Sequence, residues 1–377
     1  MTEAQTLSLP PTEPQTRLPV DQVILGDCIE EMNKLPPESV DVVFADPPYN
    51  LQLAQELWRP NLTRVDAVDD DWDQFESFEA YDRFTAAWLT ACKRLLKKNG
   101  TLWVIGSYHN IYRVGTILQN LGYWILNDIV WTKTNPMPNF RGVRFTNAHE
   151  TLLWAQREKG APYTFNHHAM KALNEDLQMR SDWSLAICSG GERLKKDGKK
   201  LHPTQKPEAL LYRVLLASTH TGDVVLDPFF GTGTTGAVAR RLHRHFIGIE
   251  RDQLYAEAAR IRIENVHQVE FNPPIFVTPD PRREARIPFG CLLENGLLEA
   301  GDMLYFGLDG AQTAVILADG SLSHGGEIGS IHQIARKIRQ APANGWELWY
   351  YLDKESNERK PINHLRSILR SASQEDR

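Results

Sequence analysis

The chain has 377 residues, 42% of them hydrophobic, and a net charge of -6, which is enough for one large domain of roughly 250 residues and a smaller one. Its four cysteines lie far apart without a Cys-x-x-Cys pair, so we expect a reducing compartment, no disulfide framework and no bound metal. No apolar run approaches the roughly 18 residues that span a bilayer, and the N-terminus lacks a signal pattern, which together predict a soluble, cytoplasmic protein with no membrane partner.

The first part of the chain leads to a strand that ends in a polar motif. Residues 1–20 are rich in Thr, Pro and Gln and are expected to be a disordered tail. A strand over 21–25 precedes a helix whose N-cap is Asp27. Four of the five residues from 40 to 44 are apolar, which indicates a strand buried on both faces, as in a parallel sheet. Asp46-Pro47-Pro48-Tyr49 then ends that strand, at the edge where open α/β sheets bind ligands.

Residues 51–73 lack clear periodicity and contain five aspartates. A charge run of this kind is usually solvated surface. However, an irregular loop of about 20 residues is more often a functional lid than a connector. Because the segment directly follows Tyr49, we expect a mobile lid beside the pocket.

The region that follows alternates between helical and strand patterns. The expected elements are a helix from 79 that stops at Gly100, a strand at 101–105, a helix at 110–121, and strands at 124–131 and 148–156. This alternation predicts a Rossmann-like, doubly wound α/β sheet.

Positive charge is concentrated in the segment from Lys133 to Lys206. This segment contains thirteen basic and seven acidic residues, counting both ends. The segment therefore carries +6 and the rest of the chain -12. Residues 132–144 break all periodicity, and 157–201 form a long polar insertion. An ordinary irregular loop is one interpretation of 132–144, and contact with base edges and phosphates is the other. The candidate DNA-contacting residues are Lys133, Asn139, Phe140, Arg141, Arg144, Lys195 and Lys196.

A second ligand motif follows an amphipathic helix that starts near Pro207. A strand over 224–227 feeds a glycine-rich turn and then a helix, so that a ligand can approach backbone N–H groups. The next strand ends at Glu250, 23 residues after Asp227, a spacing that suits a carboxylate on ribose hydroxyls. The glycines alone also fit an NAD site, whereas the absence of a following Lys-Ser/Thr excludes a P-loop.

Three motifs together resemble those of DNA amino-methyltransferases that use S-adenosylmethionine. They are Asp46-Pro47-Pro48-Tyr49, His202-Pro203-Thr204-Gln205-Lys206-Pro207 and Asp227-Pro228-Phe229-Phe230-Gly231-Thr232-Gly233-Thr234-Thr235. Their order is similar to the β class, with 133–206 as the target recognition region. Residues 135–150 and the C-terminal extension resemble the cell-cycle-regulated adenine methyltransferases of alphaproteobacteria. That resemblance covers nearly all of 21–370 and implies methylation of the adenine in GANTC.

The resemblance also implies roles for individual residues. Asp46 and the Pro47 carbonyl would accept hydrogen bonds from the target amine, beside Pro48, and Tyr49 would stack on a flipped-out base. Independently of the resemblance, an aromatic or guanidinium side chain of a lid beside the pocket would fill the hole that the extruded base leaves, which makes Trp58, Arg59 and Arg64 candidates. The implied cofactor-binding residues are Asp27, Cys28, Thr204, Lys206, Asp227, Phe229, Gly231, Gly233, Thr234, Thr235 and Glu250. For Asp27, Cys28, Thr204 and Lys206, capping and helix-start roles are the alternatives.

Four prolines in 269–283 indicate a linker between a methyltransferase domain over 21–268 and a small α+β domain over 284–377. In the second domain we expect a hairpin around Asp309-Gly310, helices at 330–338 and 361–369, and a strand at 346–352. Its cations and aromatics suit DNA contact, although the aromatics are equally suited to its core.

The sequence thus predicts a solitary adenine-N6 methyltransferase that acts on double-stranded DNA by base flipping. Alternatives are a cytosine-N4 enzyme, the methyltransferase partner of a restriction system, an RNA or protein amide methyltransferase, and a catalytically idle DNA-binding regulator. A cytosine-C5 enzyme is disfavoured because the chain has no Pro-Cys pair to supply a nucleophile. The oligomeric state is left open, with a homodimer as one option.

Overall fold

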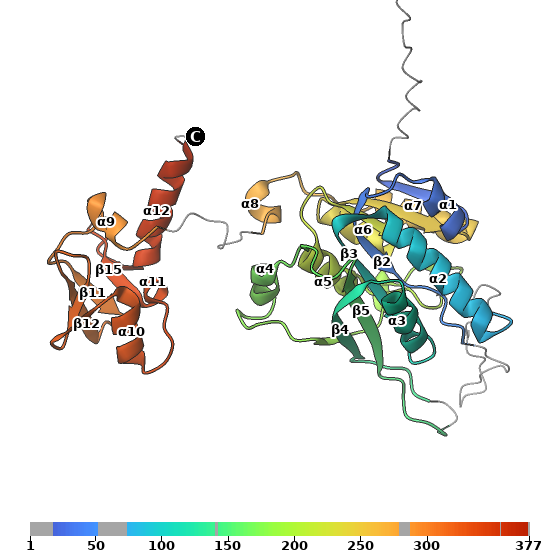
Figure 1. Cartoon of the computed structure of the whole chain (residues 1–377), viewed down its shortest axis with the longest axis horizontal. Helices are drawn as coiled ribbons and strands as arrows, with labels where there is room; N and C mark the ends of the chain where they lie inside the picture. The colour runs from blue at the N-terminus through green and yellow to red at the C-terminus, as the bar shows by residue number, and fades with distance from the viewer. Residues whose placement is uncertain (1–17, 52–73, 140–141, 279–286, 355, 376–377) are drawn as a thin grey trace, which may run out of the picture. The chain divides into compact units, whose positions relative to one another are not determined.

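A computed structural model describes residues 18–51, 74–139, 142–278, 287–354 and 356–375. It divides into two compact units, Met1–Pro279 and Asp280–Arg377 (Figure 1). Residues 1–17 of the predicted tail, the lid candidates Trp58, Arg59 and Arg64, and the loop residues Phe140 and Arg141 lie outside the described residues. The last three residues of that tail are described, and Leu18 and Val20 pack on a core of the first unit, so the tail was predicted too long. Within the described ranges, none of the helices is long and apolar enough to cross a membrane.

An eight-stranded sheet forms the centre of the first unit, in the order β1-β10-β9-β2-β3-β5-β4-β6. The first five strands in that order, β1, β10, β9, β2 and β3, are parallel to one another. Strand β5 is antiparallel to its neighbours β3 and β4, and the edge strand β6 is parallel to β4. The predicted α/β class is confirmed. The strands are β1 Gln22–Leu25, β2 Val40–Ala45, β3 Leu96–Gly106, β4 Trp124–Lys133, β5 His149–Gln156, β6 Asp182–Leu185, β9 Val224–Asp227 and β10 His245–Glu250.

Two hydrophobic cores lie on opposite faces of this sheet. One holds buried residues of α1 Cys28–Lys34, α2 Phe78–Leu95 and α3 Ile111–Asn120. The other holds those of α5 Glu208–Ser218, α6 Thr234–Arg241 and α7 Gln253–Glu264. Side chains of β2 alternate between the cores, with Val43 in the first and Phe44 in the second, which confirms a strand buried on both faces. Figure 1 shows β2 between these helices.

One prediction about the middle of the chain was wrong. The helix that begins near residue 79 ends at Leu95 rather than Gly100, because Leu96 pairs with Val40 and starts β3. The polar insertion at 157–201 contributes to the main sheet, because β6 joins it and its Trp183 packs on Trp103 at 6.1 Å between ring centroids. The same region contains α4 His167–Ala172, the 3-10 helix η2 Gly190–Glu192, β7 Lys195–Lys196 and β8 Lys199–Lys200.

The second unit is an antiparallel six-stranded sheet with helices and its own core. The predicted hairpin is confirmed by the pairing of β11 with β12. The expected strand at 346–352 begins only at Trp349, after a helical turn, and Trp346 and Trp349 are both buried in the core. Its elements are α9 Gly290–Glu294, β11 Met303–Phe306, β12 Gln312–Ile316, β13 Leu322–His324, β14 Glu327–Gly329, α10 Ile331–Arg339, α11 Gly345–Leu348, β15 Trp349–Leu352, β16 Arg359–Pro361 and α12 Ile362–Glu375; α8 Pro273–Phe276 precedes this unit.

The turn between β9 and α6 depends on Gly233, which has φ +76° and would place a Cβ 2.8 Å from the Cβ of Ala259. We expect Gly233→Ala to lower the free energy of unfolding by about 2 to 4 kcal/mol, because it combines left-handed strain with overpacking. Gly222 is the matched control. Its φ is +82° but no atom lies within 4 Å of the position that an added methyl group would take, so Gly222→Ala should cost only about 1 to 2 kcal/mol. Urea unfolding of both variants measures the difference, and equal losses would contradict the packing argument.

Candidate active site

A cavity of about 500 Å³ opens at the carboxyl ends of β2, β9 and β10. All the residues predicted from the sequence as catalytic or cofactor-binding line it, with the exception of Gly233. Residues as far apart along the chain as Asp27 and Glu250 therefore share one space. The predicted residues in its wall are Asp27, Cys28, Asp46, Pro47, Pro48, Tyr49, Thr204, Lys206, Asp227, Phe229, Gly231, Thr234, Thr235 and Glu250.

Helix α2 holds the motif that follows β2. The Tyr81 hydroxyl donates to the Pro48 carbonyl at 2.9 Å, and the Asn110 side-chain amide donates to the Tyr81 oxygen at 3.3 Å. Two successive prolines already restrict the backbone here. The position of the Asp46 carboxylate is therefore fixed by the strand on one side and by a buried hydrogen-bonded chain on the other.

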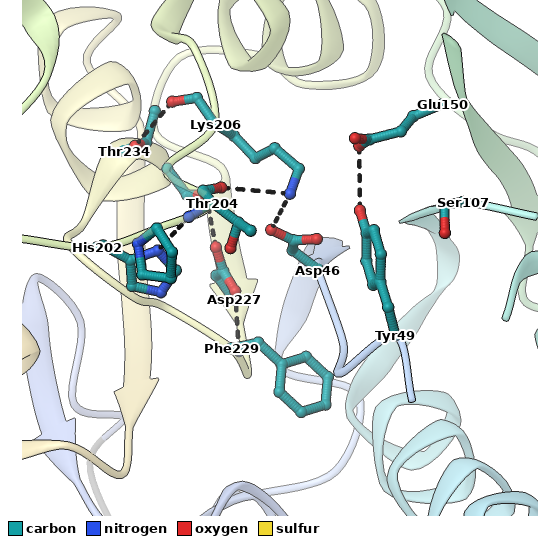
Figure 2. Close-up of polar contacts among 12 residues, drawn as sticks. Asp46, Tyr49, Ser107, Glu150, His202, Thr204, Lys206, Asp227, Phe229 and Thr234 are labelled. Atoms are coloured by element: carbon teal, nitrogen blue, oxygen red, sulfur yellow. Dashed lines mark hydrogen bonds and ion pairs between the residues drawn. The ribbon is translucent and has the colours of Figure 1, made fainter. Parts of the chain in front are cut away.

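Four charged side chains gather around this motif. The Lys206 ammonium donates to Asp46 Oδ2 at 2.6 Å, and the Tyr49 hydroxyl donates to Glu150 Oε2 at 3.1 Å. Glu150 Oε1 pairs with Lys133 Nζ at 2.7 Å. Figure 2 shows Lys206 extending toward Asp46, with Tyr49 and Glu150 beside them. We call Asp46, Lys206, Glu150 and Lys133 the charged cluster; its two cations and two anions balance.

Burial and these charges act on the pKa values in opposite directions. Burial raises the pKa of Asp46, against the effect of Lys206. Burial lowers the pKa of Lys206, but Asp46 and Glu150 outweigh it, so the net shift is upward and the ammonium form is favoured. For Glu150, burial is outweighed by Lys206 and Lys133, and its pKa is lowered. The cluster thus favours the ionised forms of Lys206 and Glu150, whereas burial disfavours the ionised form of Asp46.

The glycine-rich turn is held by two carboxylates. Asp227 accepts from the Thr235 hydroxyl at 2.5 Å and from the Phe229 N–H at 3.0 Å. Glu250 accepts from the Gly231 N–H at 2.6 Å and from the Asp252 N–H at 2.8 Å. Burial raises the pKa of Asp227 to about 7, although its hydrogen bonds act against the shift. Both carboxylates thereby orient backbone and hydroxyl groups around the cavity.

Gly233 differs from the other predicted residues of the turn. It is the left-handed N-cap of α6 and lies against Ala259 of α7 rather than in the cavity wall. The structure thus gives Gly233 a packing role, and its assignment to the cofactor stays a prediction. Thr232, between the two glycines, was not predicted, yet it lines the cavity and its buried Oγ1 has no hydrogen-bond partner among the described residues. A polar ligand would satisfy that hydroxyl.

His202 is another cavity residue to which the sequence assigned no role. Its Nδ1 accepts from the Thr204 N–H at 3.2 Å, so the neutral ring carries its proton on Nε2. Burial, with Lys206 and Arg193, lowers its pKa to about 4. The ring packs on Tyr255 at 4.6 Å between centroids. A neutral imidazole therefore faces the cavity at physiological pH.

Asp27 and Cys28 lie both at the start of α1 and in the cavity wall, so the helix-start role and the cofactor-side position do not exclude each other. Asp27 caps α1 through hydrogen bonds from the N–H groups of Ile29 and Glu30, and it also lines the cavity. Burial raises the pKa of the neighbouring Cys28 thiol to about 12, so it behaves as an apolar wall rather than a nucleophile.

The described candidates for DNA contact differ in exposure. Lys133 is turned inward onto Glu150, so the structure places it in the charged cluster and not among the exposed cations. Arg144 is exposed and donates to the Tyr108 hydroxyl at 3.2 Å, and Asn139 is partly buried. Lys195 and Lys196 lie on an exposed two-stranded ribbon, opposite Lys200 and Lys199. Across the described residues, no group of three or more His, Cys, Asp or Glu side chains could hold a metal ion.

Two protein families match the chain. The DNA methylase family N6_N4_Mtase matches residues 40–260, and RAMA, described as Restriction Enzyme Adenine Methylase Associated, matches residues 277–375.

Individual proteins match as well. The Type II methyltransferase M.HinfI of Haemophilus influenzae is 46% identical over 349 residues, which are 90% of this chain and 94% of that protein. The Type II methyltransferase M2.DpnII of Streptococcus pneumoniae is 45% identical over 64% of this chain and 89% of its own. The solved PvuII DNA methyltransferase, described as cytosine-N4-specific, shares the fold with a TM-score of 0.50 at 20% identity, covering 67% of this chain and 89% of that one.

We expect Glu250→Gln to weaken binding of S-adenosylmethionine about tenfold, because an amide cannot accept from both backbone N–H groups and loses its charge. Isothermal calorimetry measures the affinity. Glu264→Gln, an exposed change on α7, serves as the control and should leave it unaltered. An unchanged affinity in Glu250→Gln would remove Glu250 from the cofactor site.

Proposed function

The chain belongs to the N6_N4_Mtase family of DNA methylases and is a DNA methyltransferase; we propose that it transfers a methyl group from S-adenosylmethionine to N6 of an adenine flipped out of double-stranded DNA. The observation that supports this most is the placement of the Asp46 carboxylate in the cavity, between the Tyr49 ring and the glycine-rich turn.

An exocyclic amine is a poor nucleophile because its lone pair is delocalised into the ring. Two acceptors on its hydrogens would help to localise that lone pair, and the Asp46 carboxylate and the Pro47 carbonyl are the proposed pair. Tyr49 offers an aromatic face on which the extruded base stacks. After transfer the amine nitrogen must lose a proton, and Asp46, whose pKa is raised by burial, is the acceptor beside it.

The cavity fits the proposed cofactor. S-adenosylmethionine supplies a methyl group activated by its sulfonium. We assign the ribose hydroxyls to Glu250, whose carboxylate lies at the end of β10. Asp27 and Cys28 would border the adenine ring. The amino-acid end would meet Asp227, Thr232, Thr234 and Thr235, which surround the turn, with Thr204 and Lys206 across the cavity and Phe229 in its wall.

The lysine ribbon supports contact with DNA phosphates. Lys195 faces Lys200 and Lys196 faces Lys199, and like charges placed directly opposite each other are unfavourable without an anionic partner. Gln205, in the cavity wall, anchors this ribbon: its Oε1 accepts from Leu194 N–H at 3.0 Å and its Nε2 donates to Glu192 O at 2.9 Å. Gln205 would therefore connect a DNA phosphate bound to the lysine ribbon with the wall of the cavity.

The finer parts of the proposal rest on the sequence resemblance. By that resemblance, the enzyme recognises GANTC through residues 133–206 and contacts DNA through its second unit. It also acts without a partner nuclease and is tied to the cell cycle. An enzyme of this kind works on chromosomal DNA in the cytoplasm, and a homodimer is one option for its oligomeric state.

Incubation with S-adenosylmethionine and mixed-sequence DNA, followed by nucleoside analysis and sequencing of the flanks, tests the reaction. We expect N6-methyladenine in GANTC, and Asp46→Ala should abolish transfer while cofactor binding persists. Detection of N4-methylcytosine would instead show that the protein is a cytosine-N4 methyltransferase. Substantial turnover by Asp46→Ala would overturn the role of the carboxylate.

We expect Lys196→Gln to weaken DNA binding equally for cognate and unrelated duplexes, because phosphate contacts carry no sequence information. The slope of log affinity against log salt should fall by about 0.9. Lys98→Gln, an exposed lysine on the amino-terminal part of β3 and away from the cavity, is the control. A loss confined to the cognate duplex would contradict a phosphate contact.

A further inference from the structure

We propose that the Lys206 ammonium holds the place of the target amino group on Asp46 in the base-free enzyme, and that it moves to Glu150 when a base enters. The inference rests on the proposed function, in that it takes Asp46 to be the acceptor for the exocyclic amine. It makes Lys206 a positioning residue of the reaction, beyond its assignment to the cofactor.

The first step is the overlap between the ammonium and a stacked base. Lys206 Nζ lies over the Tyr49 ring, 5.3 Å from its centroid. Stacked aromatic rings have centroids roughly 4.5–7 Å apart, so a base on this face of Tyr49 would occupy the same layer. The ammonium also uses Asp46 Oδ2, at 2.6 Å, as its acceptor. A base that stacks on Tyr49 and donates its amine to Asp46 therefore displaces Lys206.

The second step is the destination of the displaced charge. Lys206 is buried, and moving an ammonium into an apolar region without a partner is unfavourable. Glu150 already attracts Lys206 electrostatically and is held beside Tyr49 through its own hydrogen bond. Because Lys133 stays paired with Glu150, a move of Lys206 from Asp46 to Glu150 keeps all four charges within one neutral cluster.

The third step is the consequence for selectivity. Entry of any base breaks the Lys206–Asp46 pair, and only a base with an exocyclic amino group restores a hydrogen bond on the buried carboxylate. A base without that group leaves Asp46 unpaired, which is costly. The pair thus protects Asp46 when the cavity holds no base and discriminates against bases that cannot replace the ammonium.

Binding to duplexes that differ only at the target position tests this. One carries adenine, one purine without the 6-amino group, and one an abasic site, each measured with sinefungin as the cofactor analogue. The ratio of affinities for the adenine and abasic duplexes reports base entry. We expect Lys206→Met to raise this ratio about tenfold at pH 8 to 9, since no ammonium has to be displaced. A ratio that falls or stays constant would mean that Lys206 supports Asp46 in the bound state, and would overturn the proposal.

A double-mutant cycle adds a second readout. Glu150→Gln removes the carboxylate that receives Lys206 and should lower the ratio. In the Lys206→Met/Glu150→Gln double variant, that loss should disappear, because no ammonium needs a new partner. A loss that persists in the double variant would show that Glu150 acts only through the Tyr49 hydroxyl, against the proposal. Thermal melting and circular dichroism establish that each variant is folded.

The wild-type protein provides the decisive structural comparison if the variants fold poorly. In a crystal structure with the adenine duplex, Lys206 Nζ should be within hydrogen-bond distance of Glu150 and no longer of Asp46; a retained Asp46 contact would overturn the proposal. The purine duplex separates the two hypotheses. If wild-type protein does not prefer adenine to purine, the amine is not recognised by Asp46 and the proposed function fails, whereas a normal preference with unmoved Lys206 removes only the place-holder role.

Discussion

The ion pair between Asp46 and Lys206 is the interaction on which the site depends. A carboxylate at the end of a buried strand is unfavourable in isolation, and an ammonium 2.6 Å away offsets part of the cost of that burial. The partner must come from a distant segment, because β2 supplies no cation of its own. The fold meets this need by placing the segment that precedes α5 across the cavity from β2, and Glu150 and Lys133 complete the balance of charge.

The cofactor side of the cavity is governed by backbone geometry rather than by charge. Gly233 lets the turn approach α7, and Glu250 and Asp227 hold the turn by accepting from backbone and hydroxyl donors. These contacts join β9, β10 and α6 into one rigid unit. The two halves of the site then meet at Thr234, whose hydroxyl donates to the Lys206 carbonyl at 3.2 Å. Cofactor and base sites are thus connected through the residue that pairs with Asp46.

Much of this could be predicted because the motifs are contiguous. A strand, its terminal acid and the following turn are specified within a dozen residues, and their common edge follows from parallel pairing. Glu150 could not be found that way, since its contact with Tyr49 spans 101 positions and requires β5 to run antiparallel beside β3. Lys133 was predicted to contact DNA because composition shows its charge but not its direction. The pairing of β4 with β5 brings it to Glu150, and this could not be predicted from the sequence. Likewise, helix propensity beyond Leu95 gives way to the pairing of Leu96 with Val40.

The central claim is that the exocyclic amine of a flipped adenine donates to Asp46 and Pro47. Nuclear magnetic resonance of a duplex with ¹⁵N-labelled N6 at the target adenine, bound with an inert cofactor analogue, observes those two protons directly. The account predicts that both amino protons shift downfield on binding the wild-type protein, and that Asp46→Ala returns one of them toward its free position. Amino resonances that stay at their duplex positions in a saturated complex, or that are insensitive to Asp46, would contradict it.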